Sequence, residues 1–283
     1  MVFARQVPGH PRESDPCTLE PDVVYGHADG VPLRYDLWRV KGARGPVPAV
    51  VVVHGGAWMN GDPSQAFGNA RHFAAHGIGT VSISYRLAPA HRFPAQLDDV
   101  RRGLRHVRAH APELGVDPGR LALLGLSAGA HLAALAHLAS ATPALAPDLP
   151  PLLRDVPEDV RAVMLHYGPY DLTRRPPRGG GWVPVAALMG ERSGDPTWLQ
   201  MASPWCQATH ARAPFLLIHG TADAVVSHRE SERMHEALLA AGRASELLLL
   251  EGAPHAFQMQ WRGEANRRAN AAMDDFLARH LLG

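Results

Sequence analysis

In RLALLGLSAGAHLAALAHLA, residues 120–139, a continuous apolar run passes through Gly-Leu-Ser-Ala-Gly into a stretch rich in Ala and Leu. The run predicts a strand buried on both faces, and the residues after Ser127 predict a buried helix. Gly125 and Gly129 let neighbouring backbone approach while the serine hydroxyl stands clear. The pattern indicates a nucleophilic serine on a tight strand-to-helix turn. The alternative is that Ser127 only caps the helix.

Other short apolar runs extend this pattern in both directions. Each is rich in Val, Ile and Leu, and continuous runs of this kind are typical of parallel strands with helices on both faces. Upstream, residues 22–40 alternate around Asp29-Gly30, which predicts an antiparallel hairpin at the edge of the sheet. The expected parallel strands are 47–56, 79–85, 120–127, 160–168, 213–220 and 245–252.

Helical patterns separate these strands. Strands that alternate with helices give a mostly parallel central sheet, joined by right-handed crossovers and flanked by helices. With 283 residues, of which 46% are hydrophobic, the chain can bury one large core, so we expect a single domain over residues 1–283. The expected helices are 94–115, with Leu97, Val100, Leu104 and Val107 on one face, 127–139, 227–242 and 263–282.

Two regions depart from this alternation, residues 1–20 and residues 173–211. The second contains TRRPPRGGGW and three of the six tryptophans. A long loop-rich segment in a compact domain is usually functional or disordered, so we expect both regions to form a small cap over the site. Apolar side chains of the second region suggest a wall for substrate, although such residues more often belong to a core. They are Trp182, Met189, Trp198, Met201 and Trp205.

The strand expected over residues 47–56 ends in His-Gly-Gly-Ala. Two adjacent glycines after a core strand are costly unless backbone must come close to another group. Acyl transfer needs such backbone, because N–H groups stabilise the developing oxyanion. The candidate donors are the N–H groups of Gly56, Ala57 and Ala128, the last at a helix N-terminus. The alternative is a tight turn without a ligand, and we interpret His54 as structural.

A serine hydroxyl needs a base to take its proton and a third group to hold that base. His255 follows the last expected strand and Asp223 follows the strand before it, so both lie at the sheet edge that carries Ser127. The order Ser, Asp, His differs from the chymotrypsin and subtilisin orders. The alternatives are a surface histidine and a turn-forming aspartate. Rival acids are Glu251, Asp274 and Asp275.

Five segments together suggest a family. They are HGGAWMNGD (54–62), YRLAPAHRFPAQLDDV (85–100), GLSAGAHLAA (125–134), HGTADAVV (219–226) and PHAF (254–257). From about Val47 to the C-terminus the chain resembles the α/β-hydrolases, specifically the carboxylesterases related to hormone-sensitive lipase and the BD-FAE-like esterases. Ala57 replaces the third glycine of HGGG, and Leu126 replaces the Asp of GDSAG. The second difference favours the BD-FAE group.

The resemblance implies an α/β-hydrolase fold and a serine carboxylesterase that hydrolyses small to medium esters through an acyl-enzyme. Its triad would be Ser127, Asp223 and His255, its oxyanion donors Gly56, Ala57 and Ala128, and no metal or organic cofactor would take part. YRLAP and the segment after it would be structural. SAGAHL also resembles arylformamidases that act on N-formylkynurenine. A non-catalytic ligand receptor on the same fold typically loses the base, so His255 argues against it, and a cofactor-free lyase or perhydrolase would use the same residues.

Charge and composition exclude several partner classes. Lys and Arg total 28 and Asp and Glu total 27, which offers no electrostatic case for nucleic acid or an anionic membrane. Cys17 and Cys206 cannot form the clusters of structural zinc, and no aliphatic run is long enough to span a bilayer. The first sixteen residues lack the apolar stretch of a secretory signal. We expect a cytoplasmic protein whose partner is a small-molecule ester, and a homodimer stays open.

Overall fold

The computed structural model describes residues 11–139, 142–174, 182–260 and 262–283. Its centre is an eight-stranded sheet in the order β1-β2-β4-β3-β5-β6-β7-β8. The first two strands pair antiparallel with each other, β2 pairs antiparallel with β4, and all later pairs are parallel. The strands are β1 Cys17–Ala28, β2 Val31–Val40, β3 Val47–Val53, β4 Gly79–Ile83, β5 Val116–Leu126, β6 Ala162–His166, β7 Phe215–Gly220 and β8 Ser245–Leu250.

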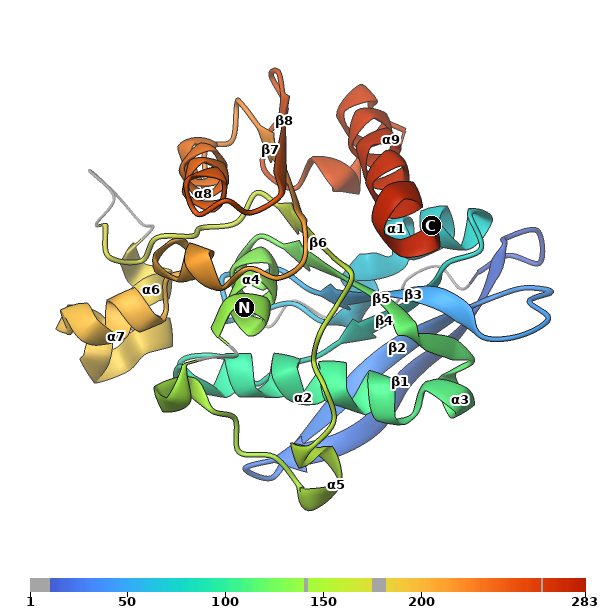
Figure 1. The fold of residues 1–283 in the computed structure, drawn as a ribbon, viewed down its shortest axis with the longest axis horizontal. Helices are drawn as coiled ribbons and strands as arrows, with labels where there is room; N and C mark the ends of the chain where they lie inside the picture. The colour runs from blue at the N-terminus through green and yellow to red at the C-terminus, as the bar shows by residue number, and fades with distance from the viewer. Residues whose placement is uncertain (1–10, 140–141, 175–181, 261) are drawn as a thin grey trace.

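Helices cover both faces of this sheet (Figure 1). The α-helices are α1 Phe67–Ala75, α2 Ala95–Ala109, α3 Ala111–Leu114, α4 Ala128–Leu138, α5 Pro151–Arg154, α6 Trp182–Met189, α7 Pro196–Met201, α8 Arg229–Ala240 and α9 Glu264–Leu277. Short 3-10 turns are Pro63–Ala66, Pro143–Leu145, Gly190–Gly194, Pro204–His210 and Phe257–Met259, and a π turn is Ala278–Leu282. All six expected parallel strands, the edge hairpin and three of the four expected helices are confirmed, while the helix expected over 94–115 is divided at His110 into α2 and α3.

The alternation of side chains along the strands creates two cores. Val51 and Val53 of β3 pack with α2, α4 and α8 on one face, whereas Val50 and Val52 pack with α1 and α9 on the other. Both sets are fully buried. This explains why the central strands are apolar at every position and not at alternate positions.

The two regions that broke the strand-helix pattern differ from expectation. Within 173–211, the described residues are largely helical and not loop-rich, and residues 175–181 lie outside the described part. Residues 17–20 begin β1 instead of forming a cap: Cys17 pairs with Val40, toward the amino ends of the parallel strands. They therefore lie away from the edge that carries Ser127. Residues 1–10 are outside the described part.

None of the helices in the described part of the chain has both the length and the apolar character that crossing a bilayer would need.

Candidate active site

The turn between β5 and α4 holds Ser127 in a strained conformation. Its φ is 54° and its ψ is −118°, values that cost a non-glycine residue about 1–3 kcal/mol. The flanking glycines make the turn feasible: a Cβ on Gly125 would lie 2.4 Å from the Cα of Ala130, and one on Gly129 would lie 2.1 Å from the carbonyl oxygen of Val53. Any side chain at either position would collide with backbone.

The hydroxyl of Ser127 does not cap the helix that follows it. Its side chain makes no capping hydrogen bond to α4. Instead Oγ lies 3.0 Å from Nε2 of His255. The helix-cap alternative is therefore not what the geometry supports, and the side chain is half-buried, so a small molecule can reach it.

His255 and Asp223 come from the loops after the last two strands. His255 follows β8, and its Nδ1 lies 2.6 Å from Oδ2 of the Asp223 carboxylate. Nδ1–H therefore donates to Asp223, and Nε2 is left to accept from the Ser127 hydroxyl. The structure brings the three predicted residues together in one hydrogen-bonded chain.

Hydrogen bonds to both carboxylate oxygens hold the side chain of Asp223 in position. Its Oδ1 accepts hydrogen bonds of 2.8 Å from the backbone N–H groups of Val225 and Val226, while Oδ2 also lies 3.2 Å from Nε2 of His219. Burial by itself would raise the pKa of this carboxyl group, but the hydrogen bonds from His219, His255 and the two amides hold the pKa well below its ordinary value. The carboxylate therefore stays ionised beside His255.

His219 is a positioning residue that the sequence did not single out. It is fully buried, and its Nδ1 lies 2.7 Å from the hydroxyl of Ser231 on α8. Its Nε2 is also 3.0 Å from the carbonyl oxygen of Val226. Within HGTADAVV the signal was a histidine four residues before the candidate acid, but the surrounding strand is so apolar that a polar role was not evident.

The loop after β3 faces the Ser127 turn closely. A Cβ on Gly55 would lie 2.9 Å from the carbonyl oxygen of Leu126 and 3.2 Å from the Cβ of Ser127. Gly56 and Ala57 both have positive φ, at 124° and 53°. Within the described residues, the N–H groups of Gly56, Ala57 and Ala128 make no hydrogen bond. Ala128 directly follows Ser127, and Gly56 and Ala57 directly follow Gly55, which contacts the Ser127 turn, so the three groups flank this turn.

Two buried histidines, His54 and His131, stabilise the loop after β3. His54 stacks on Tyr85 with ring centroids 4.2 Å apart, and burial lowers the pKa of His54 to about 4. Trp58 Nε1 donates to Nδ1 of His131 at 3.2 Å, and Nε2 of His131 lies 2.7 Å from the carbonyl oxygen of Ala202. Burial also lowers the pKa of His131 to about 4, so both rings are neutral at pH 7.

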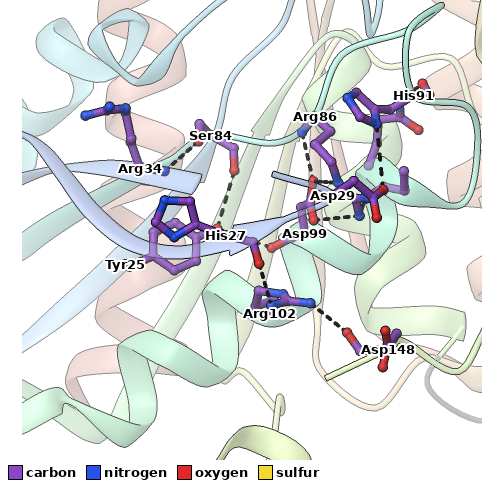
Figure 2. Close-up of polar contacts among 12 residues, drawn as sticks. Tyr25, His27, Asp29, Arg34, Ser84, Arg86, His91, Asp99, Arg102 and Asp148 are labelled. Atoms are coloured by element: carbon purple, nitrogen blue, oxygen red, sulfur yellow. Dashed lines mark hydrogen bonds and ion pairs between the residues drawn. The ribbon is translucent and has the colours of Figure 1, made fainter. Parts of the chain in front are cut away.

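A network of charged residues holds the segment after β4 against α2 and the β1–β2 turn (Figure 2). Arg86 forms two hydrogen bonds of 2.8 and 2.9 Å to the Asp99 carboxylate and a third to Asp29 in the β1–β2 turn. Close by, Arg102 reaches the carbonyl oxygens of His27 and Asp148 (Figure 2). The chain continues from Arg86 to Ala88, whose N–H donates to the carbonyl oxygen of Trp58. The YRLAP segment therefore stabilises the loop after β3. Its Arg86 side chain bonds to Asp99 and Asp29 and not to Ser127.

The rival acids do not approach His255 through any hydrogen bond of the described residues. Asp274 lies on α9 and pairs with His72 of α1, while Glu251 is exposed at the end of β8. Only Asp223, among the candidate acids, bonds to the ring of His255.

Residues 182–211 lie beside α4. Figure 1 shows α6 and α7 grouped together there, in yellow. Leu188 of α6 accepts a hydrogen bond from the N–H of Phe93, and Ala202, just after α7, bonds to His131 as described above. Met189 is buried in the core, Trp198 packs edge-on against Phe93, and the side chain of Trp182 lies outside the described part. Part of the expected substrate wall therefore belongs to the core.

The sheet order, the strained serine turn and the hydrogen-bonded chain define an α/β-hydrolase. The solved structure of Thermogutta terrifontis esterase 2 phosphonylated by sarin is similar, with a TM-score of 0.80 and 27% identity over 98% of each chain. A propionate-bound esterase from the same species gives a TM-score of 0.77 and 26% identity over 95% of this chain and 96% of that one.

The chain belongs to the BD-FAE family, whose family model matches residues 35–238. It is 34% identical to Esterase LipC of Mycobacterium tuberculosis over 84% of this chain and 59% of the relative. It is also 34% identical to Esterase LipQ of the same organism, over 90% of this chain and 61% of the relative. The chain thus spans about three fifths of the length of these curated relatives.

Proposed function

We propose that this chain is a serine carboxylesterase in which Ser127, His255 and Asp223 form the catalytic triad. The observation that carries the proposal is the unbroken chain from Ser127 Oγ to His255 Nε2 at 3.0 Å and from His255 Nδ1 to Asp223 Oδ2 at 2.6 Å. Nucleophile, base and orienting carboxylate stand in the order that acyl transfer needs. The family and the esterase relatives support the same activity.

The proposed reaction has two steps. Ser127 Oγ attacks the ester carbonyl carbon while its proton passes to His255 Nε2, and the tetrahedral intermediate collapses as His255 returns the proton to the leaving alcohol. Water then gives its proton to His255 and attacks the acyl-enzyme, which releases the acid and restores the serine. Asp223 holds the ring tautomer and stabilises the imidazolium in both steps, assisted by His219.

The open N–H groups of Gly56, Ala57 and Ala128 are the proposed oxyanion hole. They are backbone donors fixed by the close contact between the β3 loop and the Ser127 turn. Each such donor is worth about 3 kcal/mol of transition-state stabilisation. Replacement of glycine by alanine at position 57 keeps the N–H group, so the departure from HGGG leaves the hole intact.

The proposed substrates are small to medium carboxylic esters. Solved structures of the Thermogutta terrifontis esterase contain propionate or butyrate, which supports short acyl chains for a related site. The phosphonylation of that esterase by sarin supports a nucleophile of the same kind. We further propose that the chain is a single domain and that residues 173–211 cover the site, supported by the contacts of Leu188 and Ala202 with the β4–α2 segment and α4.

The test is hydrolysis of p-nitrophenyl esters by the wild-type chain and by Ser127→Ala. We expect the substitution to lower kcat by at least ~10⁴-fold, because it removes the hydroxyl that is hydrogen-bonded to Nε2 of His255. The folded state is checked by circular dichroism. A variant that keeps most of the rate sinks the proposal. A series of esters of increasing acyl length, compared with N-formylkynurenine, then distinguishes an esterase from a formamidase. Faster turnover of the formamide would make a formamide, and not an ester, the proposed substrate, and it would leave the triad proposal unchanged.

A further inference from the structure

A second group of chemically active side chains lies on the opposite side of the sheet from α4, between α1 and α9. His72 lies in α1 and His76 directly follows it, while Asp274 comes from α9, 202 residues away from His72. Figure 1 shows the two helices close to each other beside the C-terminus. All three side chains are at least partly exposed, so solvent and ions can reach them.

The three ligand atoms are already gathered. Nε2 of His72 lies 2.8 Å from Oδ1 of Asp274, and Nε2 of His76 lies 3.7 Å from Oδ2 of the same carboxylate. One ligand atom from each residue lies within 4.8 Å of the others. Ligands of a tetrahedral zinc ion at Zn–N distances near 2.0 Å stand about 3.3 Å apart. The two histidine–carboxylate separations bracket that value, and the ligand atoms of the two histidines lie within 4.8 Å of each other.

The tautomer of His76 is suitable, whereas Nε2 of His72, which donates to Asp274, would release its proton when a metal ion binds. Nδ1 of His76 lies 3.0 Å from the carbonyl oxygen of His72 and must donate to it, which leaves Nε2 without its proton and directed as a ligand. A hydrogen bond of this kind from the non-ligating nitrogen orients metal-binding histidines in general. The histidines also lie at the C-terminal end of α1, where the helix dipole favours a cation.

We propose that His72, His76 and Asp274 form a binding site for one divalent transition-metal ion such as Zn²⁺. Two imidazole nitrogens and a carboxylate oxygen suit zinc, and water would complete the coordination. The ion would join α1 to α9, two helices far apart in the sequence. The site lies beyond the amino end of β4, whereas Ser127 lies at the carboxyl ends of the strands, so the role is structural.

The chain contains its own matched control. His106 and His110 have the same four-residue spacing at the end of α2, and Nδ1 of His110 likewise lies 3.1 Å from the carbonyl oxygen of His106. In the part of the chain that the structure describes, no carboxylate completes a third ligand for this pair. The two histidine pairs therefore differ in the carboxylate that only the first possesses.

The experiment is titration of the whole chain with Zn²⁺ by isothermal calorimetry, with the melting temperature Tm measured in parallel. We expect one tight site, and a rise in Tm of roughly 5 °C at a hundred times Kd. His76→Ala and Asp274→Asn should each weaken binding at least ~10-fold, whereas His110→Ala should leave the affinity unchanged. Asp274→Asn keeps an acceptor for His72, and the exposed His76 tolerates truncation, so both variants should remain folded.

Three outcomes overturn the proposal. They are no saturable binding by the wild-type chain, binding that His76→Ala and Asp274→Asn leave intact, and binding that His110→Ala abolishes. A Co²⁺ titration gives an independent readout, because a tetrahedral site of nitrogen and oxygen ligands produces visible absorption that either variant should remove. Loss of ester hydrolysis in Ser127→Ala does not bear on this site, so the two proposals fail separately.

Discussion

Two histidine–aspartate pairs in this molecule have nearly the same contact distance and different surroundings. His255 and Asp223 approach to 2.6 Å on loops beyond the strands, and His72 and Asp274 approach to 2.8 Å between two helices. The side chain of Asp223 is fully buried and receives two backbone hydrogen bonds, whereas that of Asp274 is partly exposed. The first pair faces a serine and the second faces another histidine. The third group, and the rigidity of the carboxylate, determine which chemistry a histidine–aspartate pair can perform.

The largest effect should follow from neutralising Asp223, the proposed catalytic carboxylate. Asp223→Asn keeps the size of the side chain but favours the wrong tautomer of His255, so we expect kcat for p-nitrophenyl acetate to fall by about 10⁴-fold. Glu251→Gln, which changes a rival acid at the exposed end of β8, should stay within twofold of wild type. A loss in Glu251→Gln with activity retained in Asp223→Asn would reverse the assignment of the acid.

A smaller effect, on stability, should distinguish the backbone around Ser127, which faces the first pair, from that of α1, which carries His72 of the second pair. Gly129→Ala places a methyl group 2.1 Å from the carbonyl oxygen of Val53, and we expect it to lower the free energy of unfolding by about 3 kcal/mol. Gly68→Ala in α1 meets nothing within 4 Å, and we expect it to be neutral or to stabilise by up to ~1 kcal/mol. Urea unfolding of both variants measures the difference. Equal changes in the free energy of unfolding would mean that the backbone is packed no more closely at Gly129 than at Gly68.

The buried His131 provides a pH test of the loop beside the catalytic pair. Burial lowers its pKa to about 4, against about 6.5 in the unfolded chain, so the unfolded state binds the proton more readily. Its contribution to stability is complete above pH 6.5 and is lost as the pH falls toward 4, by about 3 kcal/mol over that window. His131→Gln can keep both hydrogen bonds without titrating. Urea unfolding at pH 7 and pH 4.5 should show a smaller pH-dependent loss in this variant, and an equal loss would contradict the account.

The sequence predicted the parts of the fold whose signal is local. Each parallel strand is a short run rich in Val, Leu and Ile, and each residue of the proposed triad lies on the turn or loop after such a run, so the shared sheet edge places them together. Gly125 and Gly129 similarly predicted the tight turn around Ser127. These features depend on a few adjacent residues and on general rules of sheet topology.

The helices of residues 173–211 were missed although one of them carried a signal. Asp195 caps α7 by accepting hydrogen bonds from the N–H groups of Thr197 and Trp198, and Pro196 is its first residue, which is a known start pattern. The helix has only six residues, too short for an apolar period. The prolines and glycines of TRRPPRGGGW, residues 173–182, indicated a loop for the whole region.

Contacts between distant segments could not be predicted from the sequence. The link from Trp58 through His131 to Ala202 joins three segments, and neither imidazole hydrogen bond has a sequence pattern. The same holds for His72 and Asp274, whose spacing of 202 residues gives no motif. Tertiary packing alone creates these pairs.

The most direct test of the triad is covalent labelling with paraoxon, followed by mass spectrometry of the digested protein. Attack by Ser127 Oγ on phosphorus would expel p-nitrophenolate and leave one diethylphosphoryl group on the peptide that contains Ser127. The account predicts stoichiometric labelling at that residue, none in Ser127→Ala, and strongly slowed labelling in Asp223→Asn. Two results would contradict the account. One is a label on another residue, and the other is a paraoxon-treated protein that keeps full ester hydrolysis and an unmodified Ser127.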